Sequence, residues 1–211
     1  ITGIGQGYTQ TTPLQLCQMT AQLANGGFKI YPKIIVEENT KAAEDIRVIM
    51  NDNYKRLNKK NKGLQDATKL LEFLNTKEHK PLFKNSKNIQ LVREAMFAST
   101  NELRGTSYKS RIENPKYQFA GKTGTSQVRR ITEAARELDL STAEIPYNER
   151  DHALYIAFGP YKNPRYALSV VIEHGGSGSS AAAPIAKKLF KLIVDRHELR
   201  EQTKIQKGIK I

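Results

Sequence analysis

Two strongly apolar segments joined by a short turn, and then a helix, constrain the fold of this chain more than any other feature. Residues 152–161 and 165–176, "HALYIAFGPY" and "RYALSVVIEHGG", are predicted strands, and the turn "YKNP" is short enough for a hairpin. The segment 119–128, "FAGKTGTSQV", predicts a third strand. A helix is predicted at 180–199, with an apolar face made of Ile185, Leu189, Leu192 and Ile193. Three consecutive strands followed by a helix favour an antiparallel sheet covered by helices, an α+β fold.

Two further helices are predicted in the N-terminal half of the chain. The first begins after Thr12, which forms a Thr-x-x-Gln capping box with Gln15, and has Pro13 at its first position. It ends at residues 25–27, Asn-Gly-Gly. The second is predicted at 88–103. Its inward face is expected to consist of Ile89, Val92, Ala95 and Met96.

The remaining segments carry weaker patterns. Short strands at a sheet margin are expected at 28–38, where Pro32 interrupts a β-prone run. Short helices are expected at 63–74 and 132–140. Neither 39–88 nor 129–151 indicates a role.

The positive charge lies mainly in two segments. The chain of 211 residues has a formal net charge of +13. Residues 51–93 hold eleven Lys/Arg against four Asp/Glu, which gives +7, and residues 187–211 hold eight against three, which gives +5. A basic nucleic-acid binder is one reading of this balance. It is disfavoured because the basic residues are not interleaved with aromatics and no nucleic-acid motif is present, so we expect no nucleic-acid partner.

No metal site or other cofactor is predicted. The single cysteine, Cys17, lies in a helical stretch and is expected to be a small core residue. The four histidines are far apart in sequence, and no two have i, i+4 spacing. The chain contains no signal peptide and no run of about 18 apolar residues. Because it does not open with methionine, we expect it to be a piece of a longer protein.

The stretch Lys122-Thr123-Gly124-Thr125 is the candidate binding element. In a strand, Lys122 and Gly124 face one side, and Thr123 and Thr125 face the other. A glycine in a strand often marks the close approach of a ligand, and an edge strand can pair with an extended peptide. A cation and two hydroxyls beside a glycine therefore favour an acidic, peptide-like ligand. A phosphate-binding loop is excluded, because that motif needs glycine where Lys116 stands, and a helix must follow.

The order of K-T-G strand, strand pair and C-terminal helix resembles that of the penicillin-recognising acyl-serine enzymes, whose signatures are S-x-x-K, S-x-N and K-T-G. The chain is most similar to the C-terminal half of the transpeptidase domain of class B penicillin-binding proteins that act in cell elongation. The long segment after "GKTGTSQV" favours this class over the septal one. The matching stretches are "GIGQGYTQTTPLQL", "GTS" at 105–107, "FAGKTGTSQV", "RDHALYIAFGPYKNP" and "VVIEHGGSG". The resemblance implies a domain portion at 1–200, and the charged segment 201–211 is expected to be a flexible tail.

The resemblance also implies a role for each residue of the K-T-G stretch. Lys122 and Thr125 would be catalytic: Lys122 supplies positive charge, and the Thr125 backbone N–H forms half of an oxyanion hole. The hydroxyls of Thr123 and Thr125 would bind the substrate carboxylate, and Gly124 would let the substrate lie close to the strand. The glycine clusters are expected to be structural: Gly5 and Gly7 with Gln6 before the first helix, and Gly175, Gly176 and Gly178 before the last.

The nucleophile of such an enzyme is missing from this chain. No serine is followed by lysine three positions later. Ser86–Asn88 fits S-x-N but lies downstream of "GIGQG" rather than upstream, so it is interpreted as a helix-capping segment. We therefore expect a fragment that is inactive alone. A non-catalytic module that binds peptide or cell-wall polymer is the alternative.

By resemblance, the partners would be peptidoglycan stem peptides ending in D-Ala–D-Ala, β-lactams, the missing N-terminal part of the same domain, and membrane proteins of the elongation machinery. The longer protein would be anchored in the bacterial inner membrane, with this part in the periplasm. Without the missing part, the first helix and one sheet face are expected to expose apolar surface, which predicts marginal stability or self-association.

Overall fold

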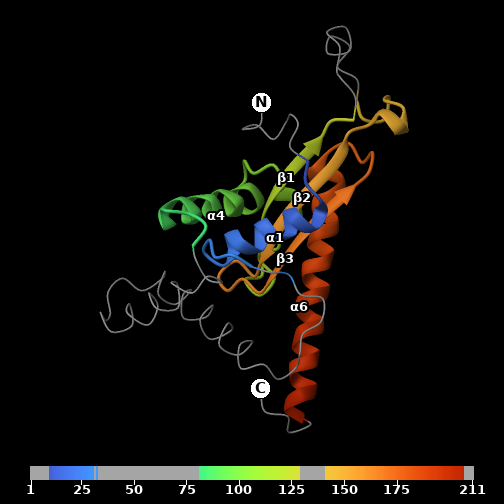
Figure 1. The fold of residues 1–211 in the computed structure, drawn as a ribbon. Coiled ribbons are helices and arrows are strands. Elements are labelled where there is room, and N and C mark those ends of the chain that lie inside the picture. The colour runs from blue at the N-terminus through green and yellow to red at the C-terminus, as the bar shows by residue number, and fades with distance from the viewer. Residues whose placement is uncertain (1–9, 31, 33–80, 129–140, 207–211) are drawn as a thin grey trace.

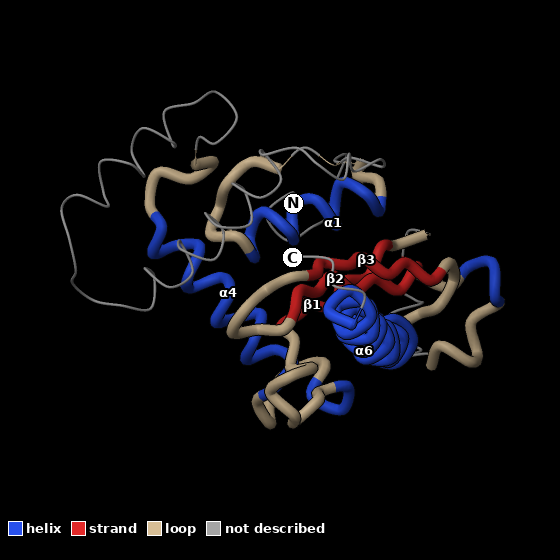
Figure 2. The backbone as a smooth tube through the Cα atoms, turned by 90° about the horizontal axis from the view of Figure 1, so that it is seen from below, coloured by secondary structure: helices blue, strands red, loops and turns tan. Residues whose placement is uncertain are grey.

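A three-stranded antiparallel sheet with helices on both faces forms the body of the protein. The computed structural model describes residues 10–30, 32, 81–128 and 141–206. The strands lie in the order β1-β2-β3. Figure 2 shows α1 above the sheet and α6 below it, with α4 beside β1. The elements are α1 (Pro13–Ala24), α4 (Ser86–Asn101), β1 (Ala120–Ser126), β2 (His152–Gly159), β3 (Tyr166–Ile172) and α6 (Ala183–Gln206). The predicted α+β class is confirmed.

The helix α1 has both of the predicted end signals. The Gln15 backbone N–H donates to Thr12 Oγ1 (3.2 Å), and the Thr12 N–H donates to Gln15 Oε1 (2.8 Å). These two bonds form the predicted capping box. Gly26 and Gly27 follow the helix with φ of 93° and 95°, which glycine adopts without steric cost.

The two faces of the sheet are buried to different extents. The α6 face carries Phe119, Ala153, Tyr155, Ala157, Leu168 and Val170, all buried against Ala183, Ala186 and Phe190. On the α1 side, Phe158 is buried, whereas Leu154 and Ile156 are half-buried. The helix α1 itself exposes Leu14 (64%) and Met19 (41%). Apolar surface on α1 and on one sheet face was expected from the sequence.

The predicted apolar face of α6 is wrong. Ile185, Leu189 and Leu192 are exposed, Leu192 by 63%, and Ile193 is only half-buried. The residues turned toward the sheet are Ala183, Ala186, Phe190 and Val194. Small alanines let the helix axis approach the strands closely, and Phe190 then stacks on Phe119 with ring centroids 4.9 Å apart. Packing, rather than the size of the apolar residues, sets the rotation of this helix.

Part of the predicted inward face of α4 is also wrong. Ile89 and Met96 are buried as predicted, but Val92 (41%) and Ala95 are exposed. The helix begins at Ser86 and ends at Asn101, close to the predicted bounds. Its C-terminal end meets the start of β1 through Thr100 and Asn101, and only Ile89, Met96 and Thr100 of the helix are buried.

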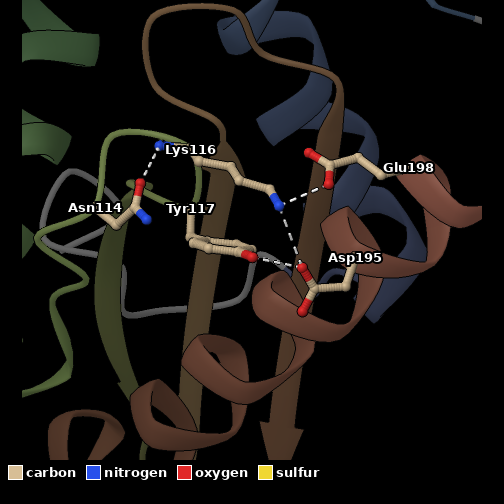
Figure 3. Close-up of polar contacts among 5 residues, drawn as sticks. All are labelled: Asn114, Lys116, Tyr117, Asp195 and Glu198. Carbon is tan, nitrogen blue, oxygen red and sulfur yellow. Dashed lines mark hydrogen bonds and ion pairs between the residues drawn. The ribbon is translucent and has the colours of Figure 1, made fainter.

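The approach to β1 is fixed to α6 by a polar cluster (Figure 3). Lys116 Nζ lies 2.6 Å from Glu198 Oε2 and 3.6 Å from Asp195 Oδ1, and the Tyr117 hydroxyl donates to Asp195 Oδ1 at 2.5 Å. The Lys116 N–H donates to Asn114 Oδ1 at 3.0 Å. The hydrogen bonds to Glu198 and Tyr117 raise the pKa of Lys116. This cluster holds the start of the K-T-G strand against the last helix.

Other predictions lie wholly or mostly outside the described residues: the glycine turn before α1, the strands at 28–38, the helix at 63–74 and the helix at 132–140. Within the described part, Phe28 forms an isolated bridge with Pro81. The last helix is longer than predicted: α6 continues to Gln206, so residues 201–206 are helical rather than part of a flexible tail. Among the described residues, no helix is long and apolar enough to cross a membrane.

Candidate functional site

The K-T-G residues lie in the middle of β1 with the predicted alternation. Lys122 pairs with Ile156 and Gly124 with Leu154, on the sheet face that meets α1 and α4. Thr123 pairs with Tyr155 and Thr125 with Ala153, on the α6 face. Lys122 and Thr125 are exposed, and Thr123 and Gly124 are half-buried. A strand, and not a phosphate-binding loop, carries these residues.

One edge of β1 is unpaired by any strand in the described part of the chain. At this edge the Gly121 N–H donates to Thr100 Oγ1 (3.0 Å), and Thr100 Oγ1 donates to the Gly121 carbonyl (3.4 Å). Because successive strand residues alternate in the direction of their backbone groups, Thr123 and Thr125 turn theirs to this same edge. Beyond Gly121, an extended ligand has backbone groups to pair with.

A row of hydroxyl groups leads along the edge to the lysine. Ser99 Oγ lies 3.2 Å from Thr106 Oγ1, which lies 3.3 Å from Thr123 Oγ1. Lys122 Nζ donates to the Thr123 carbonyl (2.8 Å) and is 3.5 Å from Thr123 Oγ1. One ammonium and three hydroxyls therefore gather on one exposed strip, which suits an anionic group. Nothing in the sequence assigns Ser99 and Thr106 to the site, although "GTS" at 105–107 is one of the stretches that resemble the family.

Gly124 is open on one side and closely supported on the other. A Cβ built at Gly124 would meet only Leu154 Cβ, at 3.4 Å. From the α6 face, Gly178 lies so close that its own Cβ would be 2.7 Å from the Gly124 carbonyl oxygen. Gly178 opens η4 (Gly178–Ala182), a π-helical turn before α6. The backbone of Gly178 therefore supports Gly124 on the α6 face, and the opposite side of Gly124 is open.

A buried cluster of three hydroxyls fixes the strand next to the K-T-G residues. The Tyr155 hydroxyl lies 2.9 Å from Thr100 Oγ1 and 3.0 Å from Ser107 Oγ, and Ser107 Oγ donates to the Ser99 carbonyl (3.0 Å). All three side chains are at most 2% exposed. Burial raises the pKa of Tyr155, so its phenol stays protonated and keeps its proton available to the cluster. The end of α4 and the edge of β1 are joined through this cluster.

The other residues singled out by sequence are not near this strip. Ser86 and Asn88 lie inside the first turn of α4, and the N-cap is Asn85, one residue before the segment that was predicted to cap the helix. Cys17 Sγ donates to the Ala167 carbonyl (3.4 Å), and burial raises the pKa of its thiol. Such a thiol is a packing group rather than a nucleophile. Among the described residues, no group of three or more His, Cys, Asp or Glu could hold a metal ion.

The chain matches one protein family over most of its length. The family model of the penicillin-binding protein transpeptidase domain matches residues 1–191. Peptidoglycan D,D-transpeptidase MrdA of Salmonella typhimurium (strain LT2) is 33% identical over 194 residues, which are 92% of this chain and 26% of the relative. MrdA of Haemophilus influenzae is 30% identical and covers 89% of this chain and 24% of the relative. The chain thus spans roughly a quarter of the length of the curated relatives it matches.

Solved structures of penicillin-binding protein 2 have the same fold. The complex between this protein and MreC from Helicobacter pylori matches with a TM-score of 0.61 and 25% identity, over 92% of this chain and 26% of that chain. The structure of Pseudomonas aeruginosa PBP2 with WCK 5153 matches with a TM-score of 0.54 and 30% identity, over 88% of this chain and 30% of that chain.

Proposed function

This chain belongs to the family of penicillin-binding protein transpeptidase domains, and we propose that it is the C-terminal part of a peptidoglycan D,D-transpeptidase. The longer protein, here called the parent protein, cross-links stem peptides during cell elongation and is acylated by β-lactams. Its nucleophilic serine and its S-x-N motif come from sequence upstream of Ile1. Residues 1–200 belong to the transpeptidase domain, and α6 continues beyond them to Gln206. The K-T-G strand with its open edge is the observation that carries this proposal.

The strand provides the surface on which the donor peptide lies. The D-Ala–D-Ala end of a stem peptide pairs with the open edge of β1 as an added strand. Its carboxylate meets the Lys122 ammonium and the hydroxyls of Thr123 and Thr125, and Gly124 leaves room for the peptide backbone. The Thr125 N–H turns to the same edge, where it donates to the carbonyl oxygen as negative charge develops on it.

The acyl-transfer step needs the upstream residues. The serine hydroxyl attacks the D-Ala–D-Ala carbonyl, its proton passes to the lysine of S-x-x-K, and the terminal D-Ala leaves. An amine of a neighbouring stem peptide then attacks the acyl-enzyme, forms the cross-link and releases the serine. Lys122 contributes charge to this reaction and is not the nucleophile.

We assign the parent protein to the inner membrane, with this domain in the periplasm and with proteins of the elongation machinery as partners. The MreC complex of the Helicobacter pylori relative supports a partner of this class. The second candidate function is a non-catalytic module that binds a peptide or cell-wall polymer at the same open edge of β1. The lack of S-x-x-K in this chain is the observation in its favour.

Labelling with a fluorescent penicillin separates the two functions. We expect label on the parent protein, none on this chain alone, and loss of label in a Lys122→Ala variant of the parent. Lys162→Ala is the matched control, because Lys162 is an exposed lysine in the β2–β3 turn and is not part of β1. A parent protein that takes no label, or that labels equally well without Lys122, would contradict the enzyme proposal.

A further inference from the structure

Two histidines meet at the end of the sheet where the K-T-G strand finishes. His152 is the first residue of β2 and pairs with Ser126, the last residue of β1. His174 lies in the turn after β3 with φ of 54°, in the left-handed region that non-glycine residues rarely adopt. Its backbone N–H donates to His152 Nδ1 at 2.9 Å, and the two rings are 4.8 Å apart in an edge-to-face arrangement.

The bond between them needs an uncharged His152. Nδ1 of His152 can accept only when it carries no proton, so the neutral ring holds its proton on Nε2. A protonated imidazole has N–H groups at both nitrogens and accepts nothing. His174 is different, because its own Nδ1 lies 3.0 Å from the Arg150 carbonyl, which can only accept. His174 therefore keeps this bond whether neutral or charged, and only protonation of His152 removes a hydrogen bond from the turn.

The turn that His152 holds reaches the K-T-G strand by two routes. The Gly176 N–H donates to the Asp151 carbonyl (2.8 Å), and Asp151 Oδ1 accepts from the Val128 N–H (3.1 Å), just beyond β1. The turn then leads into η4, where Gly178 lies under Gly124 with no room for a side chain between them. The position of the turn therefore sets the support of β1 beside Thr125.

We propose that neutral His152 is a positioning residue of the transpeptidase site: it holds the turn at 174–178 and, through Gly178, the Gly124–Thr125 part of the strand. This inference rests on the proposed function and assigns to that site a dependence on the protonation of His152. When His152 takes up a proton, the His174 N–H loses its acceptor and the turn loosens. The strand then no longer presents the Thr125 N–H in one fixed place.

Several charged and titratable groups surround the pair. They are Tyr147 and Glu149 in the 3-10 turn before β2, Arg150 and Asp151 between that turn and β2, and Glu173 in the turn after β3. The Arg150 guanidinium is bound to the carbonyls of Ala143 and Ile145, and the Asp151 carboxylate is bound to the Val128 N–H. Variants of His152 must therefore be compared with the wild type at each pH.

The test uses the parent protein between pH 5.5 and 8 and has two readouts. The first is amide hydrogen exchange at residues 174–178 and at Thr125, without any ligand. The second is the rate of acylation by a fluorescent penicillin. Because protonation of His152 removes the acceptor of the His174 N–H, both protection and acylation are expected to be lower at pH 5.5 than at pH 8.

Two asparagine variants distinguish positioning from simple stability. His152→Asn offers a side-chain oxygen that accepts without titrating, so it is expected to flatten both pH profiles relative to the wild type. His174→Asn keeps the backbone N–H and tolerates the left-handed conformation, so it is expected to keep the wild-type profiles. His152→Ala has no acceptor and is expected to lose protection of the turn at every pH.

Equal pH profiles in the wild type and His152→Asn would overturn the inference. So would equal amide protection of His174 in the wild type and His152→Ala. If the wild-type parent takes no penicillin label at any pH, the proposed function fails, while the exchange comparison still decides whether His152 holds the turn and the strand.

Discussion

Two glycines of β1, three residues apart, are expected to respond in opposite ways to the same added methyl group. Gly121 is buried, and a Cβ built there would lie 2.5 Å from Tyr155 Cζ. Gly124 is open, and its Cβ would touch only Leu154 Cβ at 3.4 Å. Gly121→Ala therefore tests the buried hydroxyl cluster, and Gly124→Ala tests the open space proposed for the peptide.

The loss of stability in Gly121→Ala can be estimated from the shift that the added methyl group forces on Tyr155. Overpacking a tight core costs about 1–3 kcal/mol. If Tyr155 shifts, its hydroxyl also leaves Thr100 and Ser107, at about 1 kcal/mol for each hydrogen bond. The total is about 3–5 kcal/mol, which lowers Tm by about 6 °C or more at about 2–4 °C per kcal/mol for a domain of 150–250 residues. Gly124→Ala is expected to change stability by less than about 1 kcal/mol, because a glycine-to-alanine change without a clash also reduces the entropy of the unfolded chain.

Thermal and urea unfolding of the parent protein, followed by labelling with a fluorescent penicillin, measure both effects. Gly121→Ala is expected to unfold at lower temperature. Gly124→Ala is expected to keep the wild-type Tm and to label at least about tenfold more slowly, because a methyl group then occupies the space for the peptide. Equal losses of Tm in the two variants would refute the reasoning about Tyr155. A normal labelling rate in Gly124→Ala would refute the proposal that the bound peptide lies against Gly124.

Three further outcomes are expected. Thr100→Ala should lower the free energy of unfolding by about 1–3 kcal/mol because it leaves the buried Gly121 N–H without its acceptor, whereas Thr100→Ser should restore most of it; urea titrations of both variants measure this. Phe190→Ala should lower the free energy of unfolding by about 3–5 kcal/mol and Leu192→Ala by less than about 0.5 kcal/mol. If thermal melts give the reverse order, the face of α6 predicted from the sequence is the one that packs against the sheet. Burial raises the folded-state pKa of Tyr155, so the contribution of the protonated phenol to stability is complete below its unfolded pKa of about 10 and is lost as pH rises through the folded value. Urea titrations between pH 9 and 11 should therefore show a loss of stability in the wild type that Tyr155→Phe lacks.

Local signals in the sequence predicted the elements well. Thr12, Gln15 and the glycines after α1 act over a few residues, and the structure has the cap and the stop where they were predicted. The alternation of Lys122 and Thr123 across β1 likewise needs only the geometry of a strand. The α+β class follows from the order of these elements.

The contacts between elements could not be predicted from spacing alone. Ile185 and Leu192 belong to a regular apolar face of the helix, but the face that contains Phe190 is the one packed against the sheet. Thr106, in the segment after α4, reaches Thr123 only in the folded chain, and a single sequence carries no pattern for that contact. The assignment of Lys122 and Thr125 to catalysis remains a prediction from the family resemblance.

The anchoring of β1 to α6 has a consequence for biosynthesis. Lys116 is bound to Glu198, 82 residues later in the chain, and Tyr117 is bound to Asp195, 78 residues later. During translation the K-T-G strand leaves the ribosome long before the helix that holds its approach. Until that helix has emerged, the strand lacks the contacts of Lys116 and Tyr117 with α6, and its open edge is prone to aggregation. A premature stop codon that removes only the last turns of α6 would leave every motif intact and still deprive the strand of its tether.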